Sequence, residues 1–133
     1  MTKVQSSRCV ILTEEAPVVA APISQGIVHN SVLYTGGQAG VVPQTGALAG
    51  SDFVSQAKQA LTNLAAVALA AETSLDQALK VTVYLASIED YAALNAIYSA
   101  FFPFDPPARK VIQAGLLPGL LVEFDAIIAL PNT

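Results

Sequence analysis

The chain has 133 residues with a formal net charge of -4; 53% of the residues are hydrophobic and 12% are charged. This acidic balance argues against nucleic acid as a main partner, because phosphate binding needs clustered Lys and Arg and the six basic residues are scattered. The length predicts one domain over residues 1–133, and so few charges predict that part of the surface meets other subunits.

The N-terminal segment does not have the pattern of a signal peptide, because Thr13, Glu14 and Glu15 interrupt its short apolar patch. No apolar run reaches the ~20 residues that span a bilayer. Cys9 is the only cysteine, which excludes an internal disulfide and fits a reducing compartment. We therefore expect a soluble, cytoplasmic protein in which Cys9 is a small buried hydrophobic residue.

The first third of the chain has the pattern of short strands. Residues 9–12 predict one strand, and residues 24–35 predict a hairpin with His29 and Asn30 at its tip. His29 is then best explained as a solvated turn residue. Gly36 and Gly37 follow and predict a bulge or a close approach of the backbone to a ligand or another chain.

Two helices follow, separated by a strand. Ser51 is predicted to cap the first, with Asp52 in its first turn and with Gln56 and Asn63 off its apolar face. Residues 79–85 alternate as a strand, and a second helix is predicted over residues 87–102, with Asn95 beside its apolar stripe. The apolar face of the first helix comprises Phe53, Ala57, Leu61, Leu64, Ala68 and Ala71.

The last segment carries two charged residues in apolar surroundings, Arg109 and Glu123, on strands that flank a Leu-Pro-Gly turn signal at residues 117–119. We expect these strands to be neighbours in a hairpin. A charged group in an apolar strand is costly to bury without a partner. The two residues are therefore either an ion pair that holds the hairpin together or a carboxylate-binding arginine beside an acid/base carboxylate. A two-residue loop would point them to opposite faces; an odd-length loop, a bulge or a neighbouring subunit would bring them together.

The order of elements predicts an α+β fold with a mixed sheet and two helices on one face. The strands are apolar on their other face as well, and no third layer remains in the chain to cover it. We therefore expect subunits to pack sheet to sheet in a closed ring.

Several segments, in this order and spacing, resemble the YjgF/RidA family of reactive imine/enamine deaminases. The resemblance covers nearly the whole chain and implies a chorismate-mutase-like trimer with a ligand cleft at each subunit interface. It also implies cofactor-free hydrolysis of an imine to a keto acid and ammonia. The matching segments are residues 21–25 (APISQ), 35–38 (TGGQ), 90–95 (DYAALN) with Tyr98, Phe101 and Phe102, 107–109 (PAR), and 117–123 (LPGLLVE).

The departures from the family pattern lie close to the expected chemistry. Ile23 replaces the tyrosine of the family's cleft, Gly36 and Lys110 replace serines, and Val111 replaces a cysteine. The cleft thus loses hydroxyl and thiol groups and gains apolar lining, which bears on the substrate more than on the reaction.

Arg109 and Glu123 remain as the candidate catalytic pair. Arg109 offers a fork of donors that would clamp a substrate carboxylate, and Glu123 in an apolar strand would have a raised pKa suited to proton transfer. The Gly37 N–H and the backbone of Val111 would complete the substrate site. Asn95 and Ile23 are weaker candidates for substrate contact. Lys110 should point to the opposite face from Arg109.

No cluster of His, Cys and carboxylate residues has metal-ligand spacing, so we expect no metal and no cofactor. Three alternatives to a general deaminase stay open. The loss of tyrosine at Ile23 supports a module that binds a small carboxylate without turnover. Ile23 and Val111 favour a deaminase of a larger, aminomuconate-like intermediate. A ribonuclease is opposed by the acidic balance.

Overall fold

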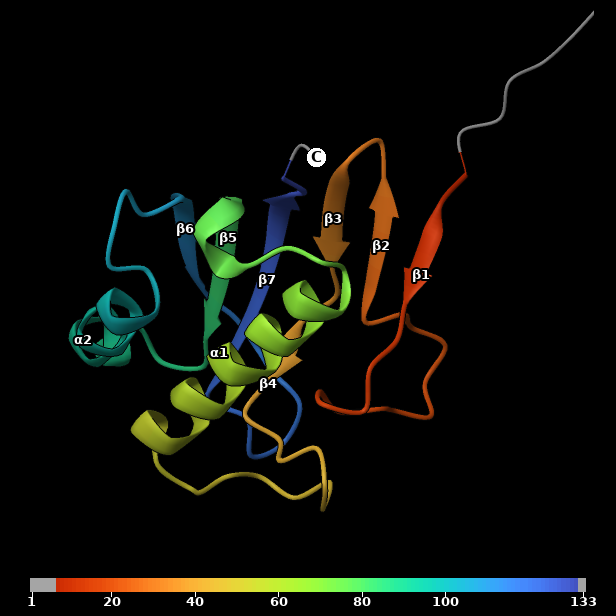
Figure 1. Cartoon of the computed structure of the whole chain (residues 1–133). Helices are drawn as coiled ribbons and strands as arrows, with labels where there is room; N and C mark the ends of the chain where they lie inside the picture. The colour runs from red at the N-terminus through yellow and green to blue at the C-terminus, as the bar shows by residue number, and fades with distance from the viewer. Residues whose placement is uncertain (1–6, 132–133) are drawn as a thin grey trace, which may run out of the picture.

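The computed structural model describes residues 7–131, which form a mixed β-sheet with two helices on one of its faces (Figure 1). This confirms the predicted α+β class. The helices are α1 (Phe53–Ala70) and α2 (Tyr91–Phe101), with short 3-10 turns η1 (Leu75–Gln77) and η2 (Ile88–Asp90). The strands are β1 (Cys9–Ile11), β2 (Gly26–His29), β3 (Val32–Thr35), β4 (Gln38–Ala39), β5 (Ala78–Leu85), β6 (Ala108–Gln113) and β7 (Val122–Ala129).

The strands follow the order β1-β2-β3-β7-β5-β6 across the sheet, and β4 pairs with β7. Among the described strands, only β5 and β6 run parallel. The predicted hairpin between the strands of Arg109 and Glu123 is therefore wrong, because β5 lies between β6 and β7. The Leu-Pro-Gly turn itself is present: Leu120 N–H donates to Leu117 O at 3.0 Å, and Gly119 has a φ of 86°.

The hairpin of β2 and β3 is confirmed, but its tip is shifted by one residue. Asn30 and Ser31 form the turn with φ angles of 52° and 64°, as a type I′ turn requires. His29 instead pairs with Val32 and is half-buried in β2. Its predicted place as a solvated tip residue is therefore wrong.

Helix α1 buries all six residues of its predicted apolar face against the sheet. Its cap is Asp52 rather than Ser51, because the Asp52 carboxylate accepts a hydrogen bond from Ser55 N–H at 2.9 Å. Ser87 caps η2, and α2 starts one turn later than predicted. Within residues 7–131, neither helix is long and apolar enough to cross a membrane.

The hydrophobic core lies between the helices and the inner face of the sheet, where Val81, Val83 and Phe124 are fully buried. Neither of the two helices among residues 7–131 lies over the outer face (Figure 1). Pairing across the strands aligns Val10, Ile27, Tyr34 and Ile127 on that face. The exposed apolar residues there are Val10, Tyr34, Ile127 and, on β6, Ile112.

Candidate active site

Glu123 lies on β7 and points to the outer face of the sheet. Its neighbours Val122 and Phe124 are buried toward the helices, and side chains alternate along a strand, so the carboxyl has to face outward. It pairs with Ala39 of β4 on one side and Tyr84 of β5 on the other. The side chain is half-buried, as a proton-transferring carboxyl in a cleft would be.

Burial raises the pKa of Glu123 above its ordinary value of 4.5, and the negative charge of Asp125 raises it further. Asp125 lies two residues along β7 on the same face and accepts a hydrogen bond from the Tyr84 hydroxyl at 2.8 Å. This hydrogen bond is the largest cause of a raised pKa of Tyr84, and burial is the second. The surroundings of Glu123 thus raise the pKa of its carboxyl, which makes it a weaker acid than an exposed glutamate.

Gly37 brings its backbone against the Glu123 carboxyl. A Cβ added at Gly37 would overlap Oε1 of Glu123, so only glycine allows this approach. The chain arrives there because Gly36 N–H donates to Gln25 O at 2.9 Å, between the end of β3 and the start of β4. The close approach predicted for the two glycines was to a ligand or another chain, whereas the backbone at Gly37 lies close to Glu123 of the same chain.

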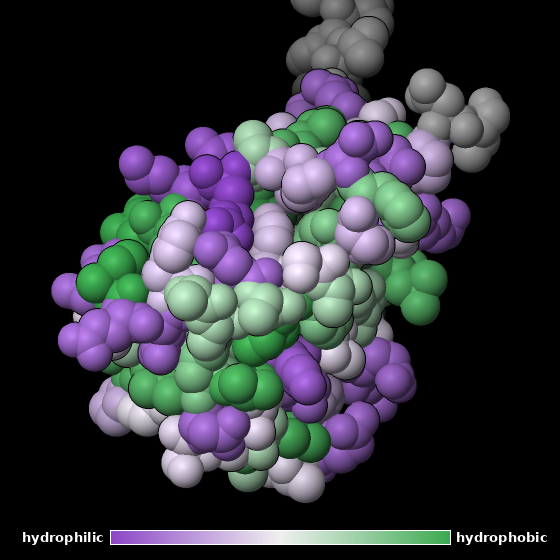
Figure 2. Space-filling model, turned by 90° about the vertical axis from the view of Figure 1, so that its left-hand side faces the viewer, coloured by the Kyte–Doolittle hydropathy of each residue, from purple (hydrophilic) through white to green (hydrophobic). Residues whose placement is uncertain are grey.

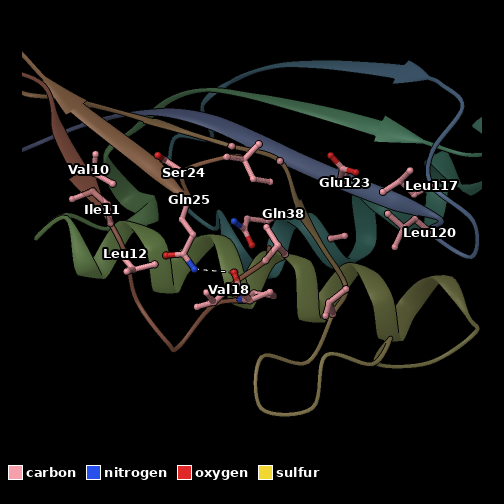
Figure 3. Close-up of a pocket in the computed structure, with 17 residues that line it drawn as sticks. Val10, Ile11, Leu12, Val18, Ser24, Gln25, Gln38, Leu117, Leu120 and Glu123 are labelled. Carbon is pink, nitrogen blue, oxygen red and sulfur yellow. Dashed lines mark hydrogen bonds between the residues drawn. The ribbon is translucent and has the colours of Figure 1, made fainter. Parts of the chain in front are cut away.

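A cavity of about 570 Å³ opens beside Glu123 and Gly37, and Ile23 lines it together with them (Figure 3). Its other walls come from β1, from the irregular segment after it, and from the turn between β6 and β7. A second cavity of similar volume adjoins the first and is lined by Glu123, Tyr84 and Asp125. Glu123 therefore faces both spaces.

Two buried polar residues of α1, Gln56 and Asn63, support this region. The Gln56 amide donates to Gly119 O at 3.0 Å and accepts from Leu121 N–H at 2.9 Å, which fixes the turn that precedes Glu123. Asn63 donates to Ala39 O at 3.0 Å and so holds β4 in place. The helical pattern placed both residues off the apolar face, so it did not predict that they are buried.

Arg109 lies elsewhere, on the inner face of β6 beside α2. Its Nη2 donates to Asn95 Oδ1 at 2.8 Å and to the Tyr91 hydroxyl at 3.2 Å, and its guanidinium lies 4.7 Å from the ring centre of Tyr98. Burial raises the pKa of Tyr98 to about 12, against the opposing effect of the Arg109 charge. The Tyr98 hydroxyl is buried and has no hydrogen-bond partner among residues 7–131.

One chain does not bring Arg109 and Glu123 together. Arg109 is in register with Val81, which is buried beneath the helices, whereas Glu123 is in register with Tyr84 on the outer face. The interpretation as an ion pair within one hairpin is therefore wrong. Asn95 lies on the same side as Arg109, because its side-chain oxygen accepts the hydrogen bond from Arg109.

Val111 follows on the inner face of β6 and is half-buried beside Val83. Lys110 points to the outer face, as predicted from its position next to Arg109. Cys9 is exposed rather than buried, because β1 is the edge strand of the sheet. No group of three or more His, Cys, Asp or Glu residues within residues 7–131 is arranged to hold a metal ion.

Sequence reasoning missed Tyr84 and Asp125, which border the second cavity. The signal for Asp125 was its spacing of two from Glu123, since residues two apart share a face of a strand. Tyr84 carried no such signal, because its contact with Asp125 depends on the register between β5 and β7.

Comparisons with known proteins agree with this fold. The model of the endoribonuclease L-PSP family matches residues 13–130. A 2-iminobutanoate/2-iminopropanoate deaminase from Capra hircus is 39% identical over 121 residues, which are 90% of this chain and 88% of the relative. The Rid family protein YyfA from Yersinia pestis superposes with a TM-score of 0.89 at 35% identity, over 93% of this chain and 100% of that one.

A structure of E. coli TdcF with bound serine has a TM-score of 0.88 at 32% identity, over 92% of this chain and 99% of that one. The region that the family model matches contains Glu123 and Ile23 as well as Arg109, since all three lie within residues 13–130. The chain belongs to the endoribonuclease L-PSP family, which is also the YjgF/RidA family.

Proposed function

We propose that this protein hydrolyses 2-imino and 2-enamino acids to 2-keto acids and ammonia in a cleft between subunits. The observation that carries the proposal is the half-buried Glu123 carboxyl, whose pKa is raised and which faces a cavity beside the Gly37 backbone. The relative from Capra hircus named as a 2-iminobutanoate/2-iminopropanoate deaminase supports it.

The proposed reaction needs only water and a group that moves protons. Water adds to the C=N carbon while the Glu123 carboxylate accepts its proton. The protonated carboxyl then delivers that proton to the nitrogen. The product of this addition carries a hydroxyl and an amino group on the same carbon. The Glu123 carboxylate then accepts the hydroxyl proton and passes it to the nitrogen, so that the C–N bond breaks as the C=O bond forms and ammonia leaves. A raised pKa suits both roles, because it moves the carboxyl from its ordinary value of 4.5 toward the pH at which one group can both accept and return a proton.

The substrate carboxylate requires a cation, and we propose that Arg109 of a second copy provides it. Arg109 lies on β6 at the edge of the sheet, and its present hydrogen-bond partners Asn95 and Tyr91 are neutral. A bidentate arginine would orient the C=N carbon toward Glu123 of the first copy.

The uncovered face of the sheet supports such an assembly. It carries exposed Val10, Tyr34, Ile127 and Ile112, which would lose water contact if another sheet packed on them. Figure 2 shows the side of α2 and β6, where hydrophobic and hydrophilic residues alternate over the surface. We propose the chorismate-mutase-like trimer that the family resemblance implies.

Two other functions have less support. A binding module without turnover would not need a carboxyl whose pKa is raised. Ribonuclease activity, which the family's description names, would need a basic surface. The net charge is -4, and the adjacent Arg109 and Lys110 point to opposite faces of the sheet.

The direct test measures ammonia and keto acid released from imino acids that an amino-acid oxidase generates in the assay. We expect the protein to accelerate release above the rate in water, for imines made from alanine through to leucine and phenylalanine. Absence of acceleration with every imine, from protein that is folded and oligomeric, would rule out the general deaminase.

The Gly37→Ala variant is expected to lower turnover at least about tenfold while the fold is retained, because the added Cβ displaces the Glu123 carboxyl from its position. The matched control is Gly115→Ala, where an added Cβ meets no atom within 4 Å. Steady-state ammonia release and circular dichroism of both variants check this. Wild-type turnover in Gly37→Ala would show that the close approach has no role.

A further inference from the structure

The cavity beside Glu123 is lined mostly by apolar side chains, and the carboxyl of Glu123 lies toward one end (Figure 3). Glu123 lies near Leu117 and Leu120 toward one end, and Val10 and Leu12 lie at the other. Its volume of about 570 Å³ falls within the range of small-molecule sites. An imine with only a methyl side chain would leave most of this space empty.

Large apolar side chains of the wall are exposed in the chain. Leu12 is 70% exposed, Ile23 67% and Val18 61%. Apolar surface gathered in a concave site marks a binding surface rather than ordinary scattered exposure. A ligand that covers these three side chains would remove them from water.

The wall that carries Val18 is held in place by Gln25. The buried Gln25 amide donates to Thr13 O and to Pro17 O, both at 2.9 Å, and accepts from Thr13 N–H at 2.7 Å. These contacts fix the segment next to Val18. They also occupy the amide, so Gln25 builds the wall and leaves ligand recognition to other groups.

Glu123 is the only charged side chain among the described residues that line this cavity, and none of them is cationic. A second carboxylate on the side chain of a substrate would meet no cation of this chain there, and the Arg109 proposed to come from a second copy is already assigned to the first carboxylate. This argues against an aminomuconate-like dicarboxylate in the cavity and in favour of a hydrocarbon chain.

We infer, on the basis of the proposed deaminase activity, that the cavity binds an apolar substrate side chain at least as large as that of leucine. The C=N group lies at Glu123, and the side chain extends along Ile23 and Val18 toward Leu12. The protein is thus selective for imines of long-chain apolar amino acids rather than for the smallest imines. Ile23 is the residue that sets this selectivity, because it lines the cavity where the family pattern has a tyrosine.

The test is a series of straight-chain imines made from alanine, 2-aminobutanoate, norvaline, norleucine and 2-aminooctanoate, with rates normalised to the oxidase flux. Each methylene buried in the cavity is expected to raise kcat/KM roughly threefold. The 2-aminooctanoate side chain has five methylenes more than that of alanine, so the gain should approach about 200-fold if all five are buried.

Two variants locate the selectivity. Ile23→Asn should reduce kcat/KM for the 2-aminooctanoate imine at least about fivefold more than for the alanine imine, since the long chain lies against the added amide. Leu69→Asn is the matched control, because Leu69 is 74% exposed on α1 and does not line the cavity. It should change neither rate.

The outcomes separate this inference from the proposed function. Hydrolysis of all imines at equal kcat/KM would overturn the inference and retain the deaminase. It would mean that side chains of a second copy fill the cavity. With no hydrolysis of any imine, the deaminase fails, and calorimetric binding of pyruvate against 2-oxooctanoate decides the inference. Tighter binding of 2-oxooctanoate that Ile23→Asn removes would support it, and equal binding would overturn it.

Discussion

The Glu123→Gln variant is expected to lower kcat for imine hydrolysis at least about 100-fold, because glutamine keeps the shape of the side chain but cannot carry a proton. Ammonia release under saturating imine measures this directly. Glu123 lines both cavities, so the variant removes the one carboxyl that both described spaces share.

The same variant is expected to increase stability at neutral pH. Burial and Asp125 raise the pKa of Glu123, so folding disfavours the ionised carboxyl. That penalty is absent below the ordinary value of 4.5, and it is fully present above the raised pKa of the folded state. Thermal unfolding should therefore show a higher Tm for Glu123→Gln at neutral pH and equal Tm values in acid.

The matched control is Asp125→Asn, the same chemical change on the same face of β7. It should retain turnover and move the acid limb of the rate profile to lower pH, since its charge no longer raises the pKa of Glu123. The other titratable groups on this face are Tyr84 beside Glu123, Lys80 and Lys110 on β5 and β6, and His29 and Tyr34 on β2 and β3. A Glu123→Gln variant that keeps wild-type turnover would contradict the proposed role of the carboxyl.

Local patterns were enough to predict most of the elements. The apolar spacing in α1 and the alternation in β5 gave the right element in each case, because each depends on residues close in sequence. The β2–β3 hairpin followed from turn residues that accept positive φ, although the tip lies at Asn30 and Ser31.

Contacts between distant segments could not be predicted in this way. The Leu-Pro-Gly turn reverses the chain locally, but it does not determine which strand becomes the neighbour, and β5 separates β6 from β7. Gln56 is buried because it satisfies Gly119 and Leu121, which lie more than sixty residues later. The spacing of apolar residues in a helix does not show which distant residues a polar side chain will contact.

This topology decides how the candidate site has to be completed. The predicted pair was drawn from one hairpin, but register places Arg109 under the helices and Glu123 on the outer face. If both act on one substrate, they come from different copies of the chain.

Joint refolding of Arg109→Ala with Glu123→Gln is therefore expected to restore activity from two inactive proteins. If each cleft takes Glu123 from one copy and Arg109 from the next, random mixing at equal amounts leaves about one quarter of the clefts intact. The activity of the mixture, relative to refolded wild-type protein, measures this fraction. Each variant refolded alone should show almost none.

The control mixes wild-type protein with the double variant Arg109→Ala/Glu123→Gln. Clefts shared between copies again give about one quarter of wild-type activity, because both contributors must be wild type. Sites contained within one chain would instead give about one half in this control and none in the first mixture. The two mixtures together therefore distinguish a shared cleft from a site within one chain, whatever the rate constant of the intact site. Agreement at one quarter in both would assign Arg109 and Glu123 to opposite sides of one interface.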